Sequence, residues 1–251
     1  MDFDVKQVGQ VNVASNKIIV YWLGGSGFIF KFDSGITVCI DPYLSNSVEK
    51  LCGFKRLSLP PLHPCELRFD VLLITHDHPD HLDADIIDDI FETNPDSYVI
   101  APQSCLEKIN HEQRFITAEP DKPFEICNLT VRTVPADHGD LSPDAVGYMM
   151  CMNDRMVYFT GDTALSEDVL QEAINVQPEI VIPCINGAFG NLSEEQAAVL
   201  LQKCNAKVSI PSHFWLFAEH GGSPQKFLDD AKRYSPQTKV FLLTPGQGQL
   251  I

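Results

Sequence analysis

Three histidines and two aspartates stand within six residues of this chain, in the run His76-Asp77-His78-Pro79-Asp80-His81. The preceding residues, Val71–Thr75, carry no charge and are mostly apolar, which predicts a buried strand that ends at the run. Imidazole and carboxylate groups are ligands of divalent zinc, manganese and iron. Crowding them at a strand end without a cation would leave costly polar groups unpaired. The run therefore predicts a metal site and argues against a solvated polar turn.

Three further polar side chains also follow segments that the sequence pattern predicts to be strands. His138 follows the strand 129–134, Asp162 follows 155–160 and His213 follows 207–210. Open α/β folds bind ligands at the carboxyl ends of their strands, so these side chains can converge with the first run. The candidate metal ligands are His76, His78, Asp80, His81, His138, Asp162 and His213.

The elements that must position these ligands alternate between strands and helices. Strands at 18–23, 28–32 and 36–40 are joined by Gly-rich and Asp-Ser-Gly turns, which predicts an antiparallel meander. Apolar residues at helical spacing predict a helix over 82–93. Further strands are predicted at 98–101, 124–127, 145–152, 179–183 and 240–243, and further helices at 103–109, 167–175, 193–204 and 223–234.

Strands followed by helices occur before about residue 140 and again after it, which predicts two packed α/β halves. We expect these halves to form a single domain over residues 1–251, because α/β domains often reach this length.

Composition narrows the class of protein. No stretch approaches the roughly 18 uncharged apolar residues of a membrane-spanning helix, and the first residues are acidic, so we expect a cytoplasmic protein with no membrane partner. The formal charge of −16, with 18 basic against 34 acidic residues, argues against a nucleic-acid partner. The eight cysteines are scattered without a Cys-x-x-Cys pair, which predicts reduced thiols, several of them in the core.

Residues 42–69 form a long stretch without strand or helix pattern, and we interpret it as an active-site flap. It carries Lys55 and Arg56, which could bind an anionic group of the substrate or could simply be solvated. Asn186, in a Gly- and Asn-rich turn, is a further candidate for substrate binding.

His220 lies beside two glycines and only seven residues after His213. It could protonate a leaving alkoxide or bind a phosphate, and the alternative is a helix-capping or surface role. His111 is expected on the surface, among Glu112, Gln113 and Arg114.

The order His-x-His-x-Asp-His, a lone His, Gly161-Asp-Thr163 and Pro211-Ser-His213 resembles the metallo-β-lactamase superfamily. This resemblance implies an α/β fold, a four-layer αβ/βα sandwich, with up to two metals. One ion would bind His76, His78 and His138, the other Asp80, His81 and His213, and Asp162 would bridge them. Asp80 would also orient the nucleophile. Asp77 is expected as a hydrogen-bond partner of an imidazole N–H.

Two cations that share a carboxylate and a water can lower the pKa of that water to about 7, which gives hydroxide at neutral pH. The diiron oxidoreductases of the superfamily have Glu at the position of His78, so the resemblance favours hydrolysis over redox chemistry.

Several segments are similar to the L-ascorbate-6-phosphate lactonase family, among them Trp22–Gly27, Gly53–Leu57 and Asn205–Val208. That family consists of cytoplasmic, manganese-using hydrolases that open the lactone of a phosphorylated sugar acid. The histidine-rich first site also suits zinc, so we expect one or two divalent ions, Mn²⁺ or Zn²⁺.

The leading hypothesis is therefore a lactonase for a small anionic substrate such as L-ascorbate 6-phosphate. A phosphodiesterase or phospholipase-type hydrolase on the same centre is the alternative. A metal-binding scaffold without catalysis would predict a lost ligand, and none of the seven is missing. The sequence leaves open whether the protein is a homo-oligomer.

Overall fold

The computed structural model describes residues 3–106, 108–109, 115–120 and 122–251, so His111 lies outside the described residues. The chain divides into two compact units, unit 1 with Met1–Ala118 and Leu243–Ile251, and unit 2 with Glu119–Leu242. The division falls before residue 140, because the strands that follow residue 119 pair with the second sheet and not with the first. The assignment of 1–251 to one domain stays a prediction.

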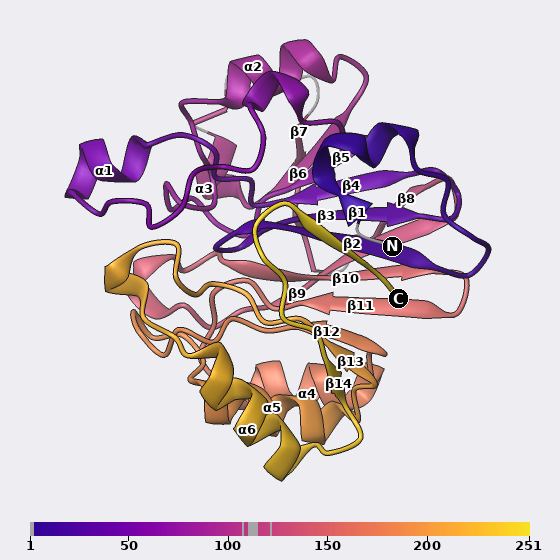
Figure 1. Cartoon of the computed structure of the whole chain (residues 1–251), viewed down its shortest axis with the longest axis vertical. Coiled ribbons are helices and arrows are strands. Elements are labelled where there is room, and N and C mark those ends of the chain that lie inside the picture. The colour runs from indigo at the N-terminus through magenta and orange to yellow at the C-terminus, as the bar shows by residue number, and fades with distance from the viewer. Residues whose placement is uncertain (1–2, 107, 110–114, 121) are drawn as a thin grey trace. The chain divides into compact units, whose positions relative to one another are not determined.

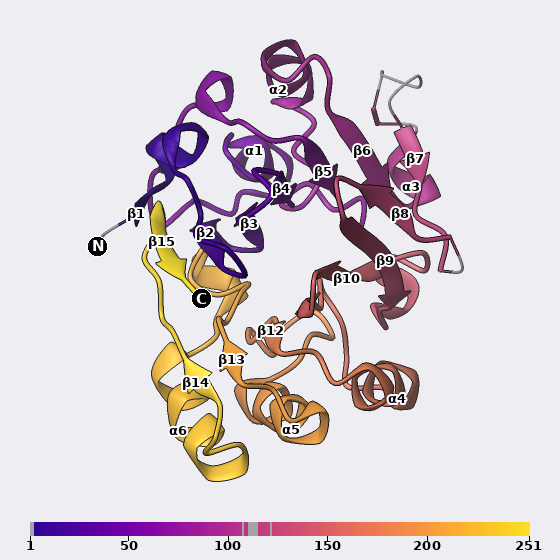
Figure 2. The same ribbon diagram turned by 90° about the vertical axis from the view of Figure 1, so that its right-hand side faces the viewer.

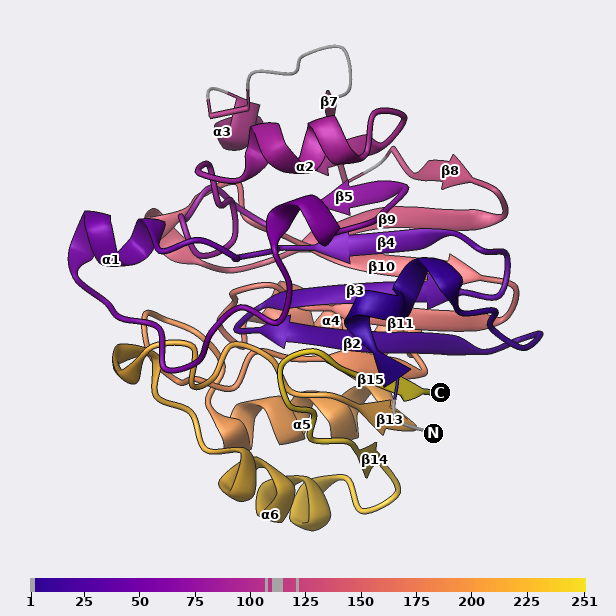
Figure 3. The ribbon, with the colours of Figure 1, turned by 45° about the horizontal axis from the view of Figure 1, so that its top comes forward.

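In the described part of the chain, unit 1 is built on a mixed sheet of eight strands in the order β1-β15-β2-β3-β4-β5-β6-β7 (Figure 1). The strands are β1 (Phe3–Asp4), β2 (Ile18–Gly24), β3 (Gly27–Phe32), β4 (Thr37–Ile40), β5 (Val71–Leu73), β6 (Tyr98–Ala101), β7 (Phe115–Thr117) and β15 (Gln247–Leu250). The antiparallel meander β2-β3-β4 is confirmed, and β15 pairs with β2 beside it (Figure 3). β4 to β7 are parallel, so their carboxyl ends share one edge.

One face of this sheet is covered by an apolar cluster that includes residues of α2 (Ile87–Thr93) and Cys105 of α3 (Gln103–Leu106) (Figure 2). Side chains that alternate along β2, such as Tyr21 and Leu23, belong to the same cluster as Ile90 and Phe91 of α2. The helix was expected from residue 82 but begins at Ile87. The preceding residues complete the turn of the histidine run, where the Leu82 N–H donates to the His78 carbonyl at 2.8 Å.

The flap of residues 42–69 was expected to be irregular, and this expectation is wrong in part. It contains α1 (Ser47–Cys52) and a 3-10 helix at Pro64–Glu66. Both are too short to produce a hydrophobic period, and α1 ends at Gly53 in the left-handed region at φ 82°. The flap is joined to the segment after the histidine run by Asp83, whose carboxylate accepts the N–H groups of Leu44 and Ser45 at 2.9 and 2.8 Å.

Unit 2 contains, among the residues described, a sheet of seven strands in the order β14-β13-β12-β11-β10-β9-β8. The strands are β8 (Phe124–Ile126), β9 (Leu129–Pro135), β10 (Val146–Met152), β11 (Arg155–Phe159), β12 (Ile180–Ile182), β13 (Val208–Ser209) and β14 (Lys239–Val240). β8 to β11 are antiparallel and β11 to β14 are parallel. Each strand predicted in this part of the chain has a counterpart, but the strand expected at 240–243 is only Lys239–Val240, so its predicted extent is wrong.

Three helices accompany this sheet, α4 (Glu167–Val176), α5 (Glu194–Cys204) and α6 (Pro224–Tyr234). They lie side by side against this sheet, with α5 in contact with α4 and α6, and with α4 in contact with β9 (Figures 1 and 2). The capping box that fixes the start of α5 is formed by Ser193 and Gln196. All eight cysteines are free thiols and four are buried, as expected. No helix in the described ranges is long and apolar enough to span a bilayer.

Candidate metal centre

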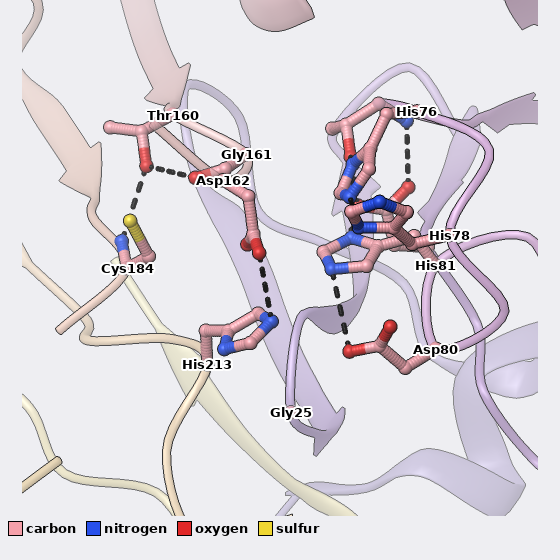
Figure 4. A network of polar contacts seen from close by, with 12 residues as sticks. Gly25, His76, His78, Asp80, His81, Thr160, Gly161, Asp162, Cys184 and His213 are labelled. Carbon is pink, nitrogen blue, oxygen red and sulfur yellow. Dashed lines mark hydrogen bonds and ion pairs between the residues drawn. The ribbon is translucent and has the colours of Figure 1, made fainter. Parts of the chain in front are cut away.

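The histidine run of unit 1 folds into a tight turn directly after β5. The N–H groups of His81 and Leu82 both donate to the carbonyl of His78, at 3.0 and 2.8 Å. This turn gathers the three imidazoles, with ring centroids 4.5 Å apart for His76 and His78 and 4.0 Å apart for His76 and His81 (Figure 4). His76 and His81 are fully buried.

Asp41 and Thr75 hold two of these rings from behind. The Asp41 carboxylate accepts from Nδ1 of His81 at 2.8 Å and from the Thr75 hydroxyl at 2.6 Å. Because the Thr75 hydroxyl donates its proton to Asp41, its oxygen accepts a hydrogen bond from Nδ1 of His76, which lies 3.0 Å away. Both imidazoles thus carry their proton on Nδ1, which leaves the lone pair of Nε2 for a metal.

Asp41 was not singled out from the sequence, where Asp77 was expected as the partner of an imidazole. Asp77 forms an ion pair with Lys108 at 2.9 Å. Asp41 has a left-handed backbone at φ 44°, a conformation uncommon for non-glycine residues and enriched at functional sites. Its position directly after β4 was the only signal in the sequence, because its partners are more than 30 residues further along the chain.

The spacing of the donor atoms in unit 1 fits a metal ion. Nε2 of His76 lies 3.0 Å from Nδ1 of His78, and Nε2 of His81 lies 3.6 Å from the Asp80 carboxylate. Two ligands that each stand about 2.0–2.2 Å from one ion are themselves roughly 3–3.5 Å apart. Ring nitrogens brought this close, on imidazoles whose other nitrogen is already hydrogen-bonded, are arranged as ligands of a cation.

In unit 2, Asp162 lies at the end of β11 on a loop that is joined to the next strand. The Thr160 hydroxyl donates to the Gly161 carbonyl at 2.8 Å and accepts the Cys184 N–H at 3.1 Å (Figure 4). Gly161 has φ 62°, and this left-handed residue turns the chain so that Asp162 leaves the strand direction. The Asp162 side chain is buried.

His138 is brought to the same end of the sheet by backbone hydrogen bonds. The Asp137 N–H donates to the Thr163 hydroxyl at 2.8 Å, and the Ala164 N–H donates to the Asp137 carbonyl at 2.7 Å. The loops that carry His138 and Asp162 are therefore adjacent. His138 is buried, 4% exposed.

His213 is the third candidate ligand of unit 2. Its Nε2 lies 3.1 Å from the Asp162 carboxylate, and the Asn191 side-chain amide donates to the same carboxylate at 2.7 Å. His213 has φ 57°, a second strained backbone at a candidate ligand. Asn191 was missed in the sequence, because a lone Asn in a turn rich in Gly and Asn is indistinguishable from a turn former.

His220 is buried, so the surface alternative is wrong, and Ser223 rather than His220 caps the following helix. Its ring is stacked on that of His213, with centroids 4.4 Å apart and 18° between the planes. Asn186 is also buried, and its amide donates to the Ala188 carbonyl at 3.3 Å. The assignment of both residues to catalysis or substrate binding stays a prediction.

The two basic residues of the flap differ in their surroundings. Arg56 donates to the carbonyls of Tyr43 and Ser58 at 2.9 and 3.1 Å, and its guanidinium lies over the Tyr43 ring. Burial lowers the pKa of the Arg56 guanidinium. The Lys55 side chain is largely exposed and lies 3.5 Å from Glu49. Arg56 thus stabilises the flap itself, and a role for either residue in substrate binding stays a prediction.

This chain is similar in sequence to a known protein family and to metal-dependent hydrolases. The model of a family described as "Beta-lactamase superfamily domain" matches residues 37–214. A UPF0173 metal-dependent hydrolase of Hyperthermus butylicus is 27% identical over 240 residues, which are 91% of this chain and 97% of the relative. A probable L-ascorbate-6-phosphate lactonase UlaG of Shigella boydii is 23% identical, over 88% of this chain and 76% of the relative.

Among solved structures, the metallo-beta-lactamase fold protein YhfI of Bacillus subtilis has a TM-score of 0.70 and 16% identity, and the match covers 94% of this chain and all of that one. The predicted α/β fold of the metallo-β-lactamase type is therefore confirmed. The histidine and aspartate side chains suited to a metal ion are, in the described ranges, His76, His78, Asp80 and His81 of unit 1 and His138, Asp162 and His213 of unit 2.

Proposed function

Because the chain belongs to the beta-lactamase superfamily and is a metal-dependent hydrolase, we propose that it is a lactonase for a phosphorylated sugar lactone such as L-ascorbate 6-phosphate. The observation that carries the metal chemistry is the 3.0 Å approach of the ring nitrogens of His76 and His78. The lactone is supported by the similarity to the probable lactonase of Shigella boydii.

The proposed enzyme binds one or two ions of Mn²⁺ or Zn²⁺, and its ligands are the seven that the family resemblance implies, His76, His78, Asp80, His81, His138, Asp162 and His213. A bound divalent ion lowers the pKa of a coordinated water to about 7 and polarises the bond that is attacked. Asp41 keeps the Nε2 lone pair of His81 available by accepting directly from its Nδ1, and that of His76 through the Thr75 hydroxyl. Asp80 accepts a hydrogen bond from the attacking water and orients it.

Hydrolysis adds the water oxygen to the carbonyl carbon of the lactone and breaks the ring C–O bond, which yields a carboxylate and a hydroxyl. We assign His220 to the leaving oxygen as a hydrogen-bond donor, because its ring is buried against that of His213. Asn186 is assigned to the substrate carbonyl or a hydroxyl group, since its amide lies in the turn that follows β12.

The decisive experiment combines elemental analysis with turnover. Protein purified without added metal should contain one or two equivalents of manganese or zinc. It should hydrolyse L-ascorbate 6-phosphate faster than the phosphodiester bis(p-nitrophenyl) phosphate. His78→Ala and His138→Ala should each lower the metal content by one equivalent if they ligate the same ion. Faster hydrolysis of the phosphodiester would favour the alternative function, and protein without metal would overturn both.

Phosphate recognition by the flap is tested by Lys55→Ala and Arg56→Ala. If these residues bind the phosphate, kcat/KM should fall far more for the phosphorylated lactone than for its unphosphorylated analogue, because only the first loses a charge-assisted contact. Arg56 also holds the carbonyls of the flap, so its loss should lower turnover of both substrates to some extent. Lys55→Ala removes a cation without this structural effect, and equal losses for both substrates in this variant would exclude phosphate binding by Lys55.

A further inference from the structure

Two large aromatic side chains of unit 2 are exposed, Phe189 in the loop that carries Asn191 and Trp215 in the loop that carries His213. Phe189 is 48% exposed and Trp215 is 57% exposed. Single exposed apolar residues are common on protein surfaces and need no explanation by themselves. Both of these residues, however, have a left-handed backbone, with φ 55° for Phe189 and φ 53° for Trp215.

The left-handed conformation costs a bulky residue about 1–2 kcal/mol relative to glycine. The chain does use glycine at Gly187 and Gly190 of the same turn, which have φ 61° and 84°. The backbone conformation therefore does not favour a phenyl ring at position 189 or an indole at position 215, and neither ring is fully buried in the core. A strained backbone that presents an exposed aromatic ring points to a function of the ring.

Both rings adjoin the His213–His220 pair. The Phe189 ring meets that of His220 edge to face, with centroids 6.2 Å apart and 71° between the planes. Trp215 is two residues after His213, and its backbone N–H donates to the carbonyl of Gly221, the residue after His220, at 3.4 Å. Both aromatic residues therefore lie next to His213, a candidate metal ligand. Trp215 is placed there by the chain that carries His213, and Phe189 by its contact with His220, whose ring stacks on that of His213.

The loops around Phe189 and Trp215 carry few charged side chains, which favours an apolar group as the ligand. Residues 185–192 and 211–222 contain no Lys or Arg, and their one acidic residue is Glu219. A phosphate would need a cation or a set of N–H donors in this position. Aromatic faces instead bind carbon-bound hydrogens and other rings through dispersion and burial of apolar area.

We propose that Phe189 and Trp215 form an apolar subsite that binds the carbon skeleton of the lactone substrate beside its reacting carbonyl. The proposal rests on the proposed lactonase activity and adds a specificity to it. Lactones with an apolar substituent should be preferred over unsubstituted ones, and any phosphate of the substrate should be bound outside these two loops.

The first test compares γ-phenyl-γ-butyrolactone with γ-butyrolactone. The ratio of their kcat/KM values should favour the phenyl compound and fall at least fivefold in Phe189→Ala and in Trp215→Ala. Trp215→Phe, which keeps an aromatic face, should retain most of the ratio. Ile174→Ala removes another partly exposed apolar side chain, on α4, and should leave the ratio unchanged. An unchanged ratio in both alanine variants would overturn the subsite.

The second test measures binding without turnover and uses the two tryptophans of the chain. Trp22 is 5% exposed and Trp215 is 57% exposed, so the emission lost in Trp215→Phe isolates the signal of Trp215. The lactam 5-phenyl-2-pyrrolidinone, which resists hydrolysis, should shift this emission to the blue in a saturable way. It should bind at least fivefold more weakly to Phe189→Ala, and 2-pyrrolidinone should bind weakly to both proteins.

These two readouts separate the inference from the proposed function. A saturable shift without turnover of any lactone would retain the apolar subsite and refute the lactonase. Turnover of lactones without a shift, and without loss of the ratio in the alanine variants, would retain the lactonase and refute the subsite.

Discussion

Unit 1 and unit 2 present their candidate metal-binding side chains in different ways. Unit 1 supplies four of them from one turn of six residues after a single strand. Unit 2 supplies three, from the ends of β9, β11 and β13, and hydrogen bonds of Asp137 join the loops after β9 and β11. The supporting groups differ as well. A buried carboxylate, Asp41, orients the imidazoles of unit 1, whereas a neutral amide, Asn191, holds the carboxylate of unit 2.

This difference indicates where each unit is vulnerable. In unit 1 the protonation of the ring nitrogens depends on one carboxylate, so a change of charge there should act on several ligands at once. In unit 2 the candidate ligands follow separate strands, so the loss of one supporting group should act on one of them. The following predictions test this contrast, from the largest expected effect to the smallest.

The largest effect is expected for Asp162→Ala. This variant should abolish metal-dependent turnover while the circular dichroism spectrum and the unfolding transition stay close to those of the wild type, because the proposed bridging carboxylate would support the ions and not the core strands. Asp137→Ala is the matched control, since Asp137 contributes backbone atoms to the neighbouring loop and its side chain is exposed. Activity near the wild-type level in Asp162→Ala would show that Asp162 is not a bridging ligand.

Asp41→Asn should lower metal affinity or activity by about 10- to 100-fold, because it removes the acceptor that fixes the Nδ1 protons while leaving a residue that tolerates positive φ. Metal content after dialysis and the metal dependence of turnover measure the effect. Asp77→Asn serves as the control within the histidine run, where it breaks the ion pair with Lys108. An equal loss in both variants would contradict the role given to Asp41.

A smaller loss is expected for Asn191→Ala. It removes one hydrogen bond to the Asp162 carboxylate, a contact of roughly 1.5 kcal/mol or more, which corresponds to about a tenfold fall in kcat/KM. The contrast between the units requires that this loss be smaller than that of Asp41→Asn under the same metal concentration. If kcat/KM falls further in Asn191→Ala than in Asp41→Asn, the claim that unit 1 depends more strongly on its supporting group than unit 2 is wrong.

The smallest effect concerns stability at high pH. Burial raises the pKa of the Cys204 thiol to about 11, above its value in the unfolded chain. The stability that this group contributes is fully present below about pH 8.5 and is lost as pH rises through 11, because the unfolded chain then ionises more readily. Between pH 8 and 11, the free energy of unfolding of the wild type should fall by roughly 3 kcal/mol more than that of Cys204→Ala in urea titrations. Parallel curves would contradict this assignment.

The sequence predicted those parts of the site in which chemistry is concentrated locally. The six-residue run after a buried strand indicated a metal, and His138, Asp162 and His213 could be added because each follows a strand that the pattern showed. Asp41 and Asn191 could not be predicted, since their roles depend on side chains about 30 to 40 residues away. The orientation of His220 depends on a stacking partner and was left open for the same reason.

Elements were predictable when they were long enough to carry a period. The meander β2-β3-β4, the hairpin β10-β11 and the helices of unit 2 have such patterns. The short helix α1 and the strands β7 and β15 do not, because a few residues of mixed polarity contain less than one full period. Their structure is determined by partners distant in the chain.

The pairing of β15 has a consequence for how the protein is made. This strand lies between β1 and β2, so the sheet of unit 1 obtains an interior member only after residues 119–242 have been synthesised. Until then, the buried strand β2 has an unpaired edge on the nascent chain. A ribosome-bound fragment that ends at residue 242 should therefore be prone to aggregation and to recognition by chaperones, although it already contains every candidate metal ligand.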